Sequence, residues 1–229
     1  MSIFYYLGDK SLDYRGIMHR HDAITIDGTI IDTARVVVCE QTHSDIVHIC
    51  TEADAGAGFG SHPQIEAADG LICNVPALYL LIRTADCTPV LFYDEKEGVV
   101  GAVHSGREGT RKNICVKAVK LMQSQYGCEP DNIHAIIGAG ICPAHYEVSE
   151  DIWQKFYESL LADGIAPVNP VHRHPDIQDA IYTQLLQKGL RSENIVRKDI
   201  CTYEAENYFS YRRDGTRNRQ INLIGVLHV

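Results

Sequence analysis

The sequence predicts one layered domain of the α+β or α/β type. Short strand-like runs fill the first two-thirds of the chain, amphipathic helices follow them, and no repeat or long linker separates the two parts. The 229 residues suit one large domain or two small ones, and they are enough to bury a core without disulfides. We therefore expect a single domain over residues 1–229.

Six strands are expected before the first long helix. Each is a short run of β-branched, aliphatic or aromatic residues between turn residues. The runs are ARVVVCE, DIVHIC, GLICNVP, LYLLIRT, PVLFYD and GVVGAVHSG, between residues 34 and 106. The Gly- and Ala-rich stretch 51–70 is expected to be a functional or mobile loop, because long loops in compact domains usually are.

Helical spacing begins after these strands. Residues 108–127 are expected to form a helix that Gly127 ends. Its apolar face would carry Ile114, Ala118, Leu121 and Met122. Further along, residues 132–140 and 219–229 are expected to be strands, and residues 149–164 and 176–190 amphipathic helices. The first of these helices has acidic residues after Ser149, as capping and the helix dipole favour.

Composition and charge narrow the class of protein. Hydrophobic residues make up 45% and charged residues 22%, as in an ordinary soluble domain. The net charge of -9 disfavours nucleic acid polymers and anionic membranes as general partners, although a local basic pocket stays open. No apolar run approaches the length of a membrane span.

The eight cysteines indicate a reducing compartment. They are scattered without a CxxC pair, and several lie in apolar strand-like runs, where a free Cys behaves as a small hydrophobe. The first residues show no signal-peptide pattern. We therefore expect reduced thiols and a cytoplasmic protein.

Three residues at predicted strand ends are candidate metal ligands: His43, Cys87 and His104. A lone Cys87 would most often be buried and structural. Two His at other predicted strand ends favour a ligand role for Cys87. His₂Cys is a known set of zinc ligands that leaves a fourth position open to water or substrate. Their spacing matches no short zinc motif. Asp86 is a candidate general acid by adjacency to Cys87, or a structural group, because neighbours in a strand face opposite sides.

Near the C-terminus, YFSYRRDGTRNRQ is a local basic cluster in an acidic chain. A charge run is usually a solvated loop. The alternative is a site for phosphate or carboxylate, which Arg suits by its geometry. The cluster contains Arg212, Arg213, Arg217 and Arg219.

Two weaker patterns are expected to be structural. Gly138-Ala139-Gly140 lacks the third Gly of a dinucleotide fingerprint and is expected to be a tight turn. The H-x-H pairs at residues 19–21 and 172–174 are expected to lie in exposed loops, although copper sites use such pairs.

Taken together, several segments resemble the YfiH-like family, also called the laccase-domain or polyphenol oxidase family. The matching pieces are EQTHSDIV, ADGLIC, TADCTPVLFYD, GAVHSG, IGAGICPAHYEV and YFSYRRDGTRNRQINLIG. They follow the family order from about residue 36 to the C-terminus. The joint pattern is specific, whereas no single piece is.

The resemblance implies that His43, Cys87 and His104 are the metal ligands. It implies an α-β-β-α layered fold, similar to the catalytic domain of cytotoxic necrotizing factor. It also implies purine nucleoside phosphorylase activity on adenosine, inosine, guanosine and methylthioadenosine, with adenosine deaminase activity beside it. The expected cofactor is zinc, with copper as the alternative. The expected partners are a nucleoside and phosphate, and the expected state is a monomer or small homo-oligomer.

This chain departs from the family pattern in two places. The usual HAGWRG is HSGREG, so that Arg107 and Glu108 replace Trp and Arg. If the family's Arg meets phosphate, Glu108 reverses that charge, and Arg107 would point about 100° away on a helix. The usual TRxGG stretch near the N-terminus has no clear counterpart beside YRGIMHR.

Four hypotheses follow. The first is a zinc enzyme acting on nucleosides, with Arg212, Arg213 or Arg107 on the phosphate. The second is a cysteine hydrolase with Cys87 as nucleophile and His104 as base, and family members are described as amidases on peptidoglycan precursors. The third is copper-dependent phenol oxidation at the zinc site. The fourth is a binding module that has lost activity, which only the Glu108 change favours.

Overall fold

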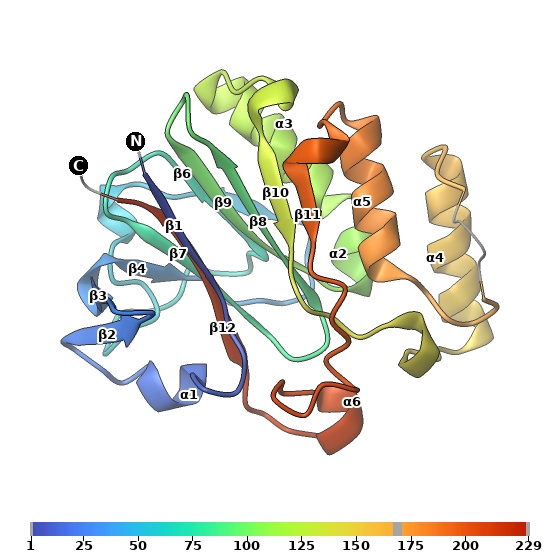
Figure 1. Cartoon of the computed structure of the whole chain (residues 1–229), viewed down its shortest axis with the longest axis horizontal. Coiled ribbons are helices and arrows are strands. Elements are labelled where there is room, and N and C mark those ends of the chain that lie inside the picture. Colours follow the sequence, from blue (N-terminus) through green and yellow to red (C-terminus); the bar gives the residue numbers. More distant parts are fainter. Residues whose placement is uncertain (1, 167–170, 228–229) are drawn as a thin grey trace.

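Two β-sheets packed face to face form the centre of the protein (Figure 1). The structure is a computed structural model and describes residues 2–166 and 171–227. One sheet has the order β1 (Ile3–Leu7), β12 (Gln220–Val226), β7 (Tyr79–Thr84), β4 (Val36–Val38). The other has the order β11 (Ile195–Arg197), β10 (His134–Ile137), β8 (Thr88–Asp94), β9 (Val99–Ser105), β6 (Gly70–Cys73), β5 (Val47–Ile49).

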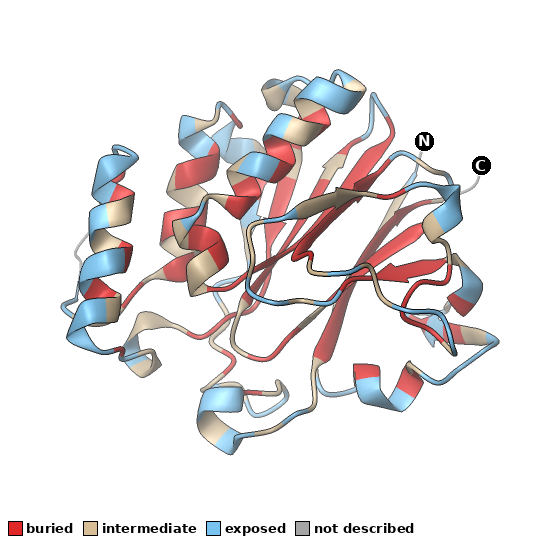
Figure 2. Cartoon of the chain, turned by 180° about the vertical axis from the view of Figure 1, so that it is seen from behind, coloured by how far each residue is buried: buried red, intermediate tan, exposed pale blue. Residues whose placement is uncertain are grey.

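Helices cover the outer face of the six-stranded sheet. They are α2 (Arg107–Arg111), α3 (Ile114–Tyr126), α4 (Glu150–Ala162) and α5 (Ile177–Gln187). Their buried sides, red in Figure 2, turn toward the sheet. Phe156 and Ile181 pack there with Val90 and Val103 in one apolar cluster. A second cluster, with Leu80, Leu91 and Ile224, fills the space between the sheets. Since the central strands are covered on both faces, they appear in the sequence as continuous apolar runs.

The outer face of the four-stranded sheet is covered differently. The single-turn helix α1 (Tyr14–Ile17) and a hairpin of β2 (Ala23–Ile26) and β3 (Thr29–Asp32) pack on it. The expected α-β-β-α layering is therefore confirmed for one helical layer and two sheets, and corrected in the fourth layer. Asp27 and Gly28 both have positive φ, as a two-residue hairpin turn requires. The Asp-Gly pair in the sequence is the signal that predicts this hairpin.

The predicted helix over residues 108–127 is two helices, α2 and α3. Asn113 interrupts it with a φ of 61°, a left-handed conformation that Asn tolerates better than most residues. Gly127 ends α3 with a φ of 72°, as predicted. The other predicted strands and helices are present with shifted ends, and residues 228–229 of the last strand lie outside the described residues.

The last helix is α6 (Tyr211–Asp214), a single turn beneath the ends of the sheets in Figure 1. It carries part of the basic cluster. None of the helices in the described part of the chain is long and apolar enough to cross a membrane.

Candidate metal centre and basic cleft

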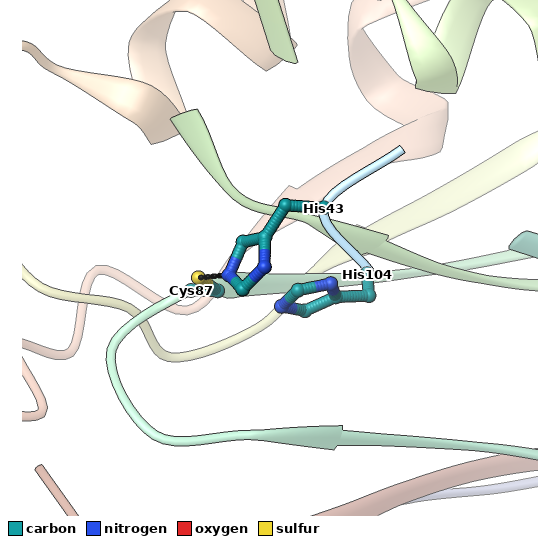
Figure 3. A group of neighbouring side chains, drawn as sticks. All are labelled: His43, Cys87 and His104. Atoms are coloured by element: carbon teal, nitrogen blue, oxygen red, sulfur yellow. Dashed lines mark hydrogen bonds between the residues drawn. The ribbon is translucent and has the colours of Figure 1, made fainter. Parts of the chain in front are cut away.

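The structure brings His43, Cys87 and His104 together (Figure 3). Their potential ligand atoms all lie within 4.8 Å of one another, and the Cys87 Sγ is 3.8 Å from the His43 Nε2. Cys87 occupies the turn where the chain passes from β7 in one sheet to β8 in the other. His104 lies on β9 opposite Pro89 of β8, which places it beside that turn. His43 comes from the loop between β4 and β5.

Asp69 holds the ring of His104 and the backbone of His43, and its own side chain is fully buried. Its Oδ1 accepts hydrogen bonds from the His104 Nδ1 at 2.7 Å and from the His43 backbone N–H at 3.1 Å. Its Oδ2 accepts from the backbone N–H of Thr42 and from both donors of Ser44. Since the Nδ1 of His104 is held by Asp69, its Nε2 is left for the site.

Asp86 holds the Cys87 turn in place. It has a φ of 95°, a conformation that needs support from its surroundings. Its carboxylate accepts from the Thr202 hydroxyl at 2.8 Å and from the Arg212 backbone N–H at 2.7 Å. Its carbonyl accepts from the Ile141 backbone N–H at 2.8 Å. Both carboxylate oxygens are engaged, so these contacts favour the structural alternative for Asp86 over the general acid.

Charge couples Cys87 and His104. Burial would raise the pKa of the Cys87 thiol, but the neighbouring His104 and His43 lower it to about 6. Burial would lower the pKa of His104, but the Cys87 sulfur and Asp69 raise it to about 9. At neutral pH the metal-free pair is therefore a thiolate beside an imidazolium. A cation bound here replaces the proton on the Nε2 of His104.

The donor set fits zinc. In a tetrahedral site with the usual Zn–S and Zn–N bond lengths, sulfur and nitrogen lie about 3.6 Å apart. The 3.8 Å between the Cys87 Sγ and the His43 Nε2 needs only a small adjustment. One soft thiolate and two imidazoles also suit copper, so the donor chemistry alone admits both metals.

The metal centre opens into a cleft of about 740 Å³. Five arginines line it, and Asp86 is the one acidic residue among its lining. The arginines are Arg15, Arg83, Arg212, Arg217 and Arg219. Because the whole chain carries a charge of -9, this concentration of guanidinium groups creates a local site for anions.

Of the three arginines expected to bind phosphate, one lines this cleft. Arg212 does so, but its guanidinium donates to the carbonyls of His145 and Glu147 and lies 5.2 Å from the centre of the Tyr146 ring. Arg213 lies outside the lining and donates to four backbone carbonyls of the 202–208 segment. Arg107 also lies outside it, 3.4 Å from Glu108 and from the Tyr146 hydroxyl. Arg213 and Arg107 thus have partners within the protein, and their assignment to the phosphate stays a prediction.

Sequence reasoning missed Asp69, Arg15, Arg83 and Tyr146. Asp69 lies in the ADG motif and Tyr146 in the HYEV motif. Both motifs contribute to the family resemblance, but neither residue is given a role by it. Arg15 belongs to the N-terminal YRGIMHR segment, where the usual TRxGG stretch has no clear counterpart. Only the fold brings α1 to the cleft.

The H-x-H pairs do not take part in this centre. His19 and His21 are exposed, His172 lies 2.9 Å from the Glu150 carboxylate, and His174 donates to the Pro143 carbonyl. Among the described residues, none of these four belongs to a group of three metal-ligand side chains.

Gly106→Ala is expected to weaken metal binding about 10-fold without removing a ligand. A Cβ at Gly106 would lie 3.0 Å from both the Cys87 Sγ and the His43 Cδ2. The φ of −77° suits alanine, so the backbone is not strained. Zinc titration against a chromophoric chelator measures the effect. Gly16→Ala, which meets nothing within 4 Å, is the matched control. Unchanged zinc affinity would contradict the close approach.

Comparison with known proteins gives a consistent picture. The family model described as multi-copper polyphenol oxidoreductase laccase matches residues 6–227. A purine nucleoside phosphorylase of Corynebacterium glutamicum is 37% identical over 190 residues, which cover 83% of this chain and 74% of that protein. The purine nucleoside phosphorylase YlmD of Bacillus subtilis is 31% identical, covering 83% of this chain and 70% of its own length.

Solved structures agree with the fold. The crystal structure of YlmD from Geobacillus stearothermophilus superposes with a TM-score of 0.79 at 29% identity. The match covers 86% of this chain and 76% of that one.

Proposed function

Because this chain belongs to the multi-copper polyphenol oxidoreductase laccase family and its relatives named above are purine nucleoside phosphorylases, we propose that it is a zinc-dependent enzyme of that activity. The proposed substrates are adenosine, inosine, guanosine and methylthioadenosine with phosphate, and adenosine deamination is proposed beside phosphorolysis. The observation that carries the proposal is one cleft in which a His₂Cys group adjoins five arginines. We further propose a cytoplasmic protein, which the eight unpaired cysteines support, and a monomer or small homo-oligomer.

Phosphorolysis makes specific demands on the cleft. A phosphate oxygen forms a bond to the anomeric carbon of the ribose while the bond from that carbon to the purine nitrogen breaks. The purine leaves with the bonding electrons and takes up a proton. The enzyme must therefore bring an anion against the sugar and stabilise negative charge on the departing base.

Arg15 and Arg217 are the arginines best placed to hold phosphate. Both line the cleft and are exposed, and within residues 2–166 and 171–227 neither side chain donates a hydrogen bond. Arg83 and Arg219, by contrast, donate to groups of the protein, including the carbonyls of Cys39 and Thr216. A guanidinium without internal partners can place its paired N–H groups on two phosphate oxygens.

The metal centre supplies the second half of the chemistry. His43, Cys87 and His104 would hold zinc, which when bound provides a Lewis acid at the floor of the cleft. Asp69 keeps the Nδ1 of His104 engaged and fixes the ring toward the cleft. Tyr146 also lines the cleft, and the Arg212 guanidinium lies over its ring.

The reversed charge at Glu108 does not oppose the proposal. Its carboxylate lies 3.1 Å from Arg111, and Arg107 is beside it. It lies outside the lining of the cleft, so it places no negative charge against a bound phosphate. The same observation removes the one feature that favoured an inactive binding module.

Arg217→Gln is expected to raise the KM for phosphate about 10-fold while kcat changes little. One charged hydrogen bond of about 1.5–3 kcal/mol would be lost from phosphate binding. Initial rates at varied phosphate concentration measure it. Arg191→Gln, which removes the same charge from a residue paired with Asp131 outside the cleft lining, is the control. Equal KM values in the two variants would remove Arg217 from the phosphate site.

The test of the proposed function is chromatography of adenosine incubated with zinc-loaded protein, with and without phosphate. Adenine and ribose 1-phosphate that appear only with phosphate, and not with Cys87→Ala, support phosphorolysis. Inosine formed without phosphate supports the deaminase activity. If no free purine base and no deaminated nucleoside appears from any of the four nucleosides, the proposal is wrong.

A second candidate is a metal-free cysteine hydrolase that cleaves amides, with Cys87 as nucleophile and His104 as its acid–base partner. It rests on the thiolate–imidazolium pair, and on the expected likeness to the necrotizing factor domain. The lowered pKa means that alkylation of metal-free Cys87 by iodoacetamide should rise with pH around 6 and then level off. His104→Ala should move that midpoint toward the ordinary thiol value of about 8.5. Amidase activity that survives chelation would favour this candidate over the zinc enzyme.

A further inference from the structure

A second group of metal-ligand side chains lies outside the cleft. The Sγ atoms of Cys142 and Cys201 and a carboxylate oxygen of Glu204 all lie within 4.8 Å of one another. Cys142 follows β10 in the 138–146 turn, and Cys201 and Glu204 follow β11, so two parallel neighbouring strands bring them together. We propose that Cys142, Cys201 and Glu204 form a second binding site for zinc or another thiophilic divalent cation.

Each sulfur has a polar partner in this region. The backbone N–H of Cys142 donates to the Sγ of Cys201 at 3.3 Å, and the Sγ of Cys142 lies 3.9 Å from the Glu204 Oε1. Burial, Cys201 and Glu204 raise the pKa of the Cys142 thiol to about 11, so a bound cation would have to displace its proton. Tetrahedral zinc requires sulfurs about 3.8 Å apart, and the two Sγ atoms lie within 4.8 Å of each other. Two thiolates with a carboxylate select zinc-like cations over magnesium or calcium.

His145 fixes the third ligand. Its Nε2 lies 2.9 Å from the Glu204 Oε1, and its ring stacks on Tyr203 with 4.3 Å between the centroids. The carboxylate is thus held from outside the site, as partners of metal ligands usually hold them. A separate hollow of about 270 Å³ adjoins all three ligands, so water can reach the fourth position.

The side chain of Arg213 supports the loop that carries Cys201 and Glu204. The guanidinium of Arg213 donates to the carbonyls of Thr202, Tyr203, Ala205 and Tyr208. This explains an arginine of the basic cluster that the cleft does not use. The backbone that carries two of the three ligands is therefore held in place before a cation binds.

The position of this site gives it a structural effect. Cys142 follows Ile141, and Cys201 precedes Thr202, and these two neighbours hold Asp86 through hydrogen bonds of 2.8 Å each. A cation that joins Cys142 to Cys201 fastens both segments that support the turn of Cys87. The second site would thus stabilise the turn of Cys87 through ligands that the first site does not share.

Cobalt(II) titration separates the two sites, because each thiolate ligand adds charge-transfer absorption in the near ultraviolet. We expect two Co²⁺ per wild-type chain and one in Cys87→Ala, with about two-thirds of the thiolate absorption kept because two of three thiolates remain. Adding Cys142→Ser and Cys201→Ser to that variant should remove the rest. Both cysteines are half-buried, so circular dichroism and thermal melting should show a folded chain.

Glu204→Gln in the Cys87→Ala background should weaken Co²⁺ binding at least about 10-fold, and zinc should raise the Tm of Cys87→Ala but not of the triple variant. The inference is overturned if Cys87→Ala shows no thiolate absorption, or if the triple variant keeps it. It is also overturned if chain isolated with zinc and without reductant has lost two thiols to a Cys142–Cys201 disulfide.

Discussion

Cys87→Ala is expected to remove one of two bound metal ions and to lower phosphorolysis at least about 100-fold, since a Lewis acid contributes several kcal/mol to such a reaction. The substitution takes away the thiolate and leaves His43 and His104 as an incomplete pair. It also removes the charge that raises the pKa of His104. Zinc content by atomic absorption and the rate of adenine formation measure the two effects together.

The control for this prediction compares two histidines that are close in sequence, His43 and His48. His43→Ala should reproduce the loss of metal and activity, whereas His48→Ala should not. His48 lies on β5 only five residues on, but it pairs with Asp54 and lines a separate hollow, not the cleft. If Cys87→Ala and His43→Ala keep full zinc and full activity, the His₂Cys group is not the catalytic metal centre.

The three ligands could be predicted because each has a local signal. His43, Cys87 and His104 follow or end apolar runs, and the motifs around them resemble one family. Their convergence depends on two facts that the motifs already imply: Cys87 lies between two strands, and His104 lies on the next one. The spacing of the three residues matches no short zinc motif, so the strand-end positions made them candidates and the family resemblance joined them into one group.

Other site residues depend on pairing between distant segments. Asp69 reaches His104 because β6 pairs with β9, with Gly70 opposite Val103. The number of residues between Asp69 and His104 does not predict that pairing register. Arg212 and Arg213 are neighbours on one helical turn, yet one lines the cleft and the other holds the 202–208 loop. Adjacent arginines look alike in a sequence, and only the packing of α6 separates them.

Local backbone chemistry explains the differences in secondary structure. The β2–β3 hairpin has its Asp-Gly turn signal, but each of its strands is only four residues long, which is too short for a strong apolar pattern. At Asn113 the helical spacing of apolar residues continues across the break, and Asn is an ordinary helix residue by propensity that also tolerates positive φ. The sequence therefore carries the turn signal of the hairpin and the Asn at the helix break, but neither stands out from its neighbours.

Asp69→Asn is expected to have the largest effect of any change that leaves all three ligands in place. Asp69 accepts five hydrogen bonds, divided between its two oxygens. An asparagine has one NH₂ group, and either orientation of the amide turns that group toward at least two donors. Buried N–H groups would lose their acceptor, and the charged partner of His104 would be gone. We expect a loss of about 3–5 kcal/mol in the free energy of unfolding.

Zinc binding should separate this positioning role from a general loss of stability. Without Asp69 the ring of His104 is no longer fixed, so the highest zinc affinity should fall about 10–100-fold. The pKa of His104, which Asp69 helps to raise to about 9, should fall at the same time. Protons compete with zinc for His104 below its pKa, so the pH at which zinc loading levels off should move downward. A residue that acted only through stability would lower the Tm and leave that pH unchanged.

The carboxylate of Asp45 gives a matched control, because it belongs to the β4–β5 loop that carries His43 and pairs with Lys112 and Lys117. Asp45→Asn should cost no more than about 1 kcal/mol and should leave zinc affinity unchanged. Equal effects from the two substitutions would mean that the loop, and not the buried carboxylate, organises the histidines. A fall in affinity confined to Asp69→Asn, with the lower pH of zinc loading, would identify one buried charge as the group that sets both the direction and the proton affinity of His104.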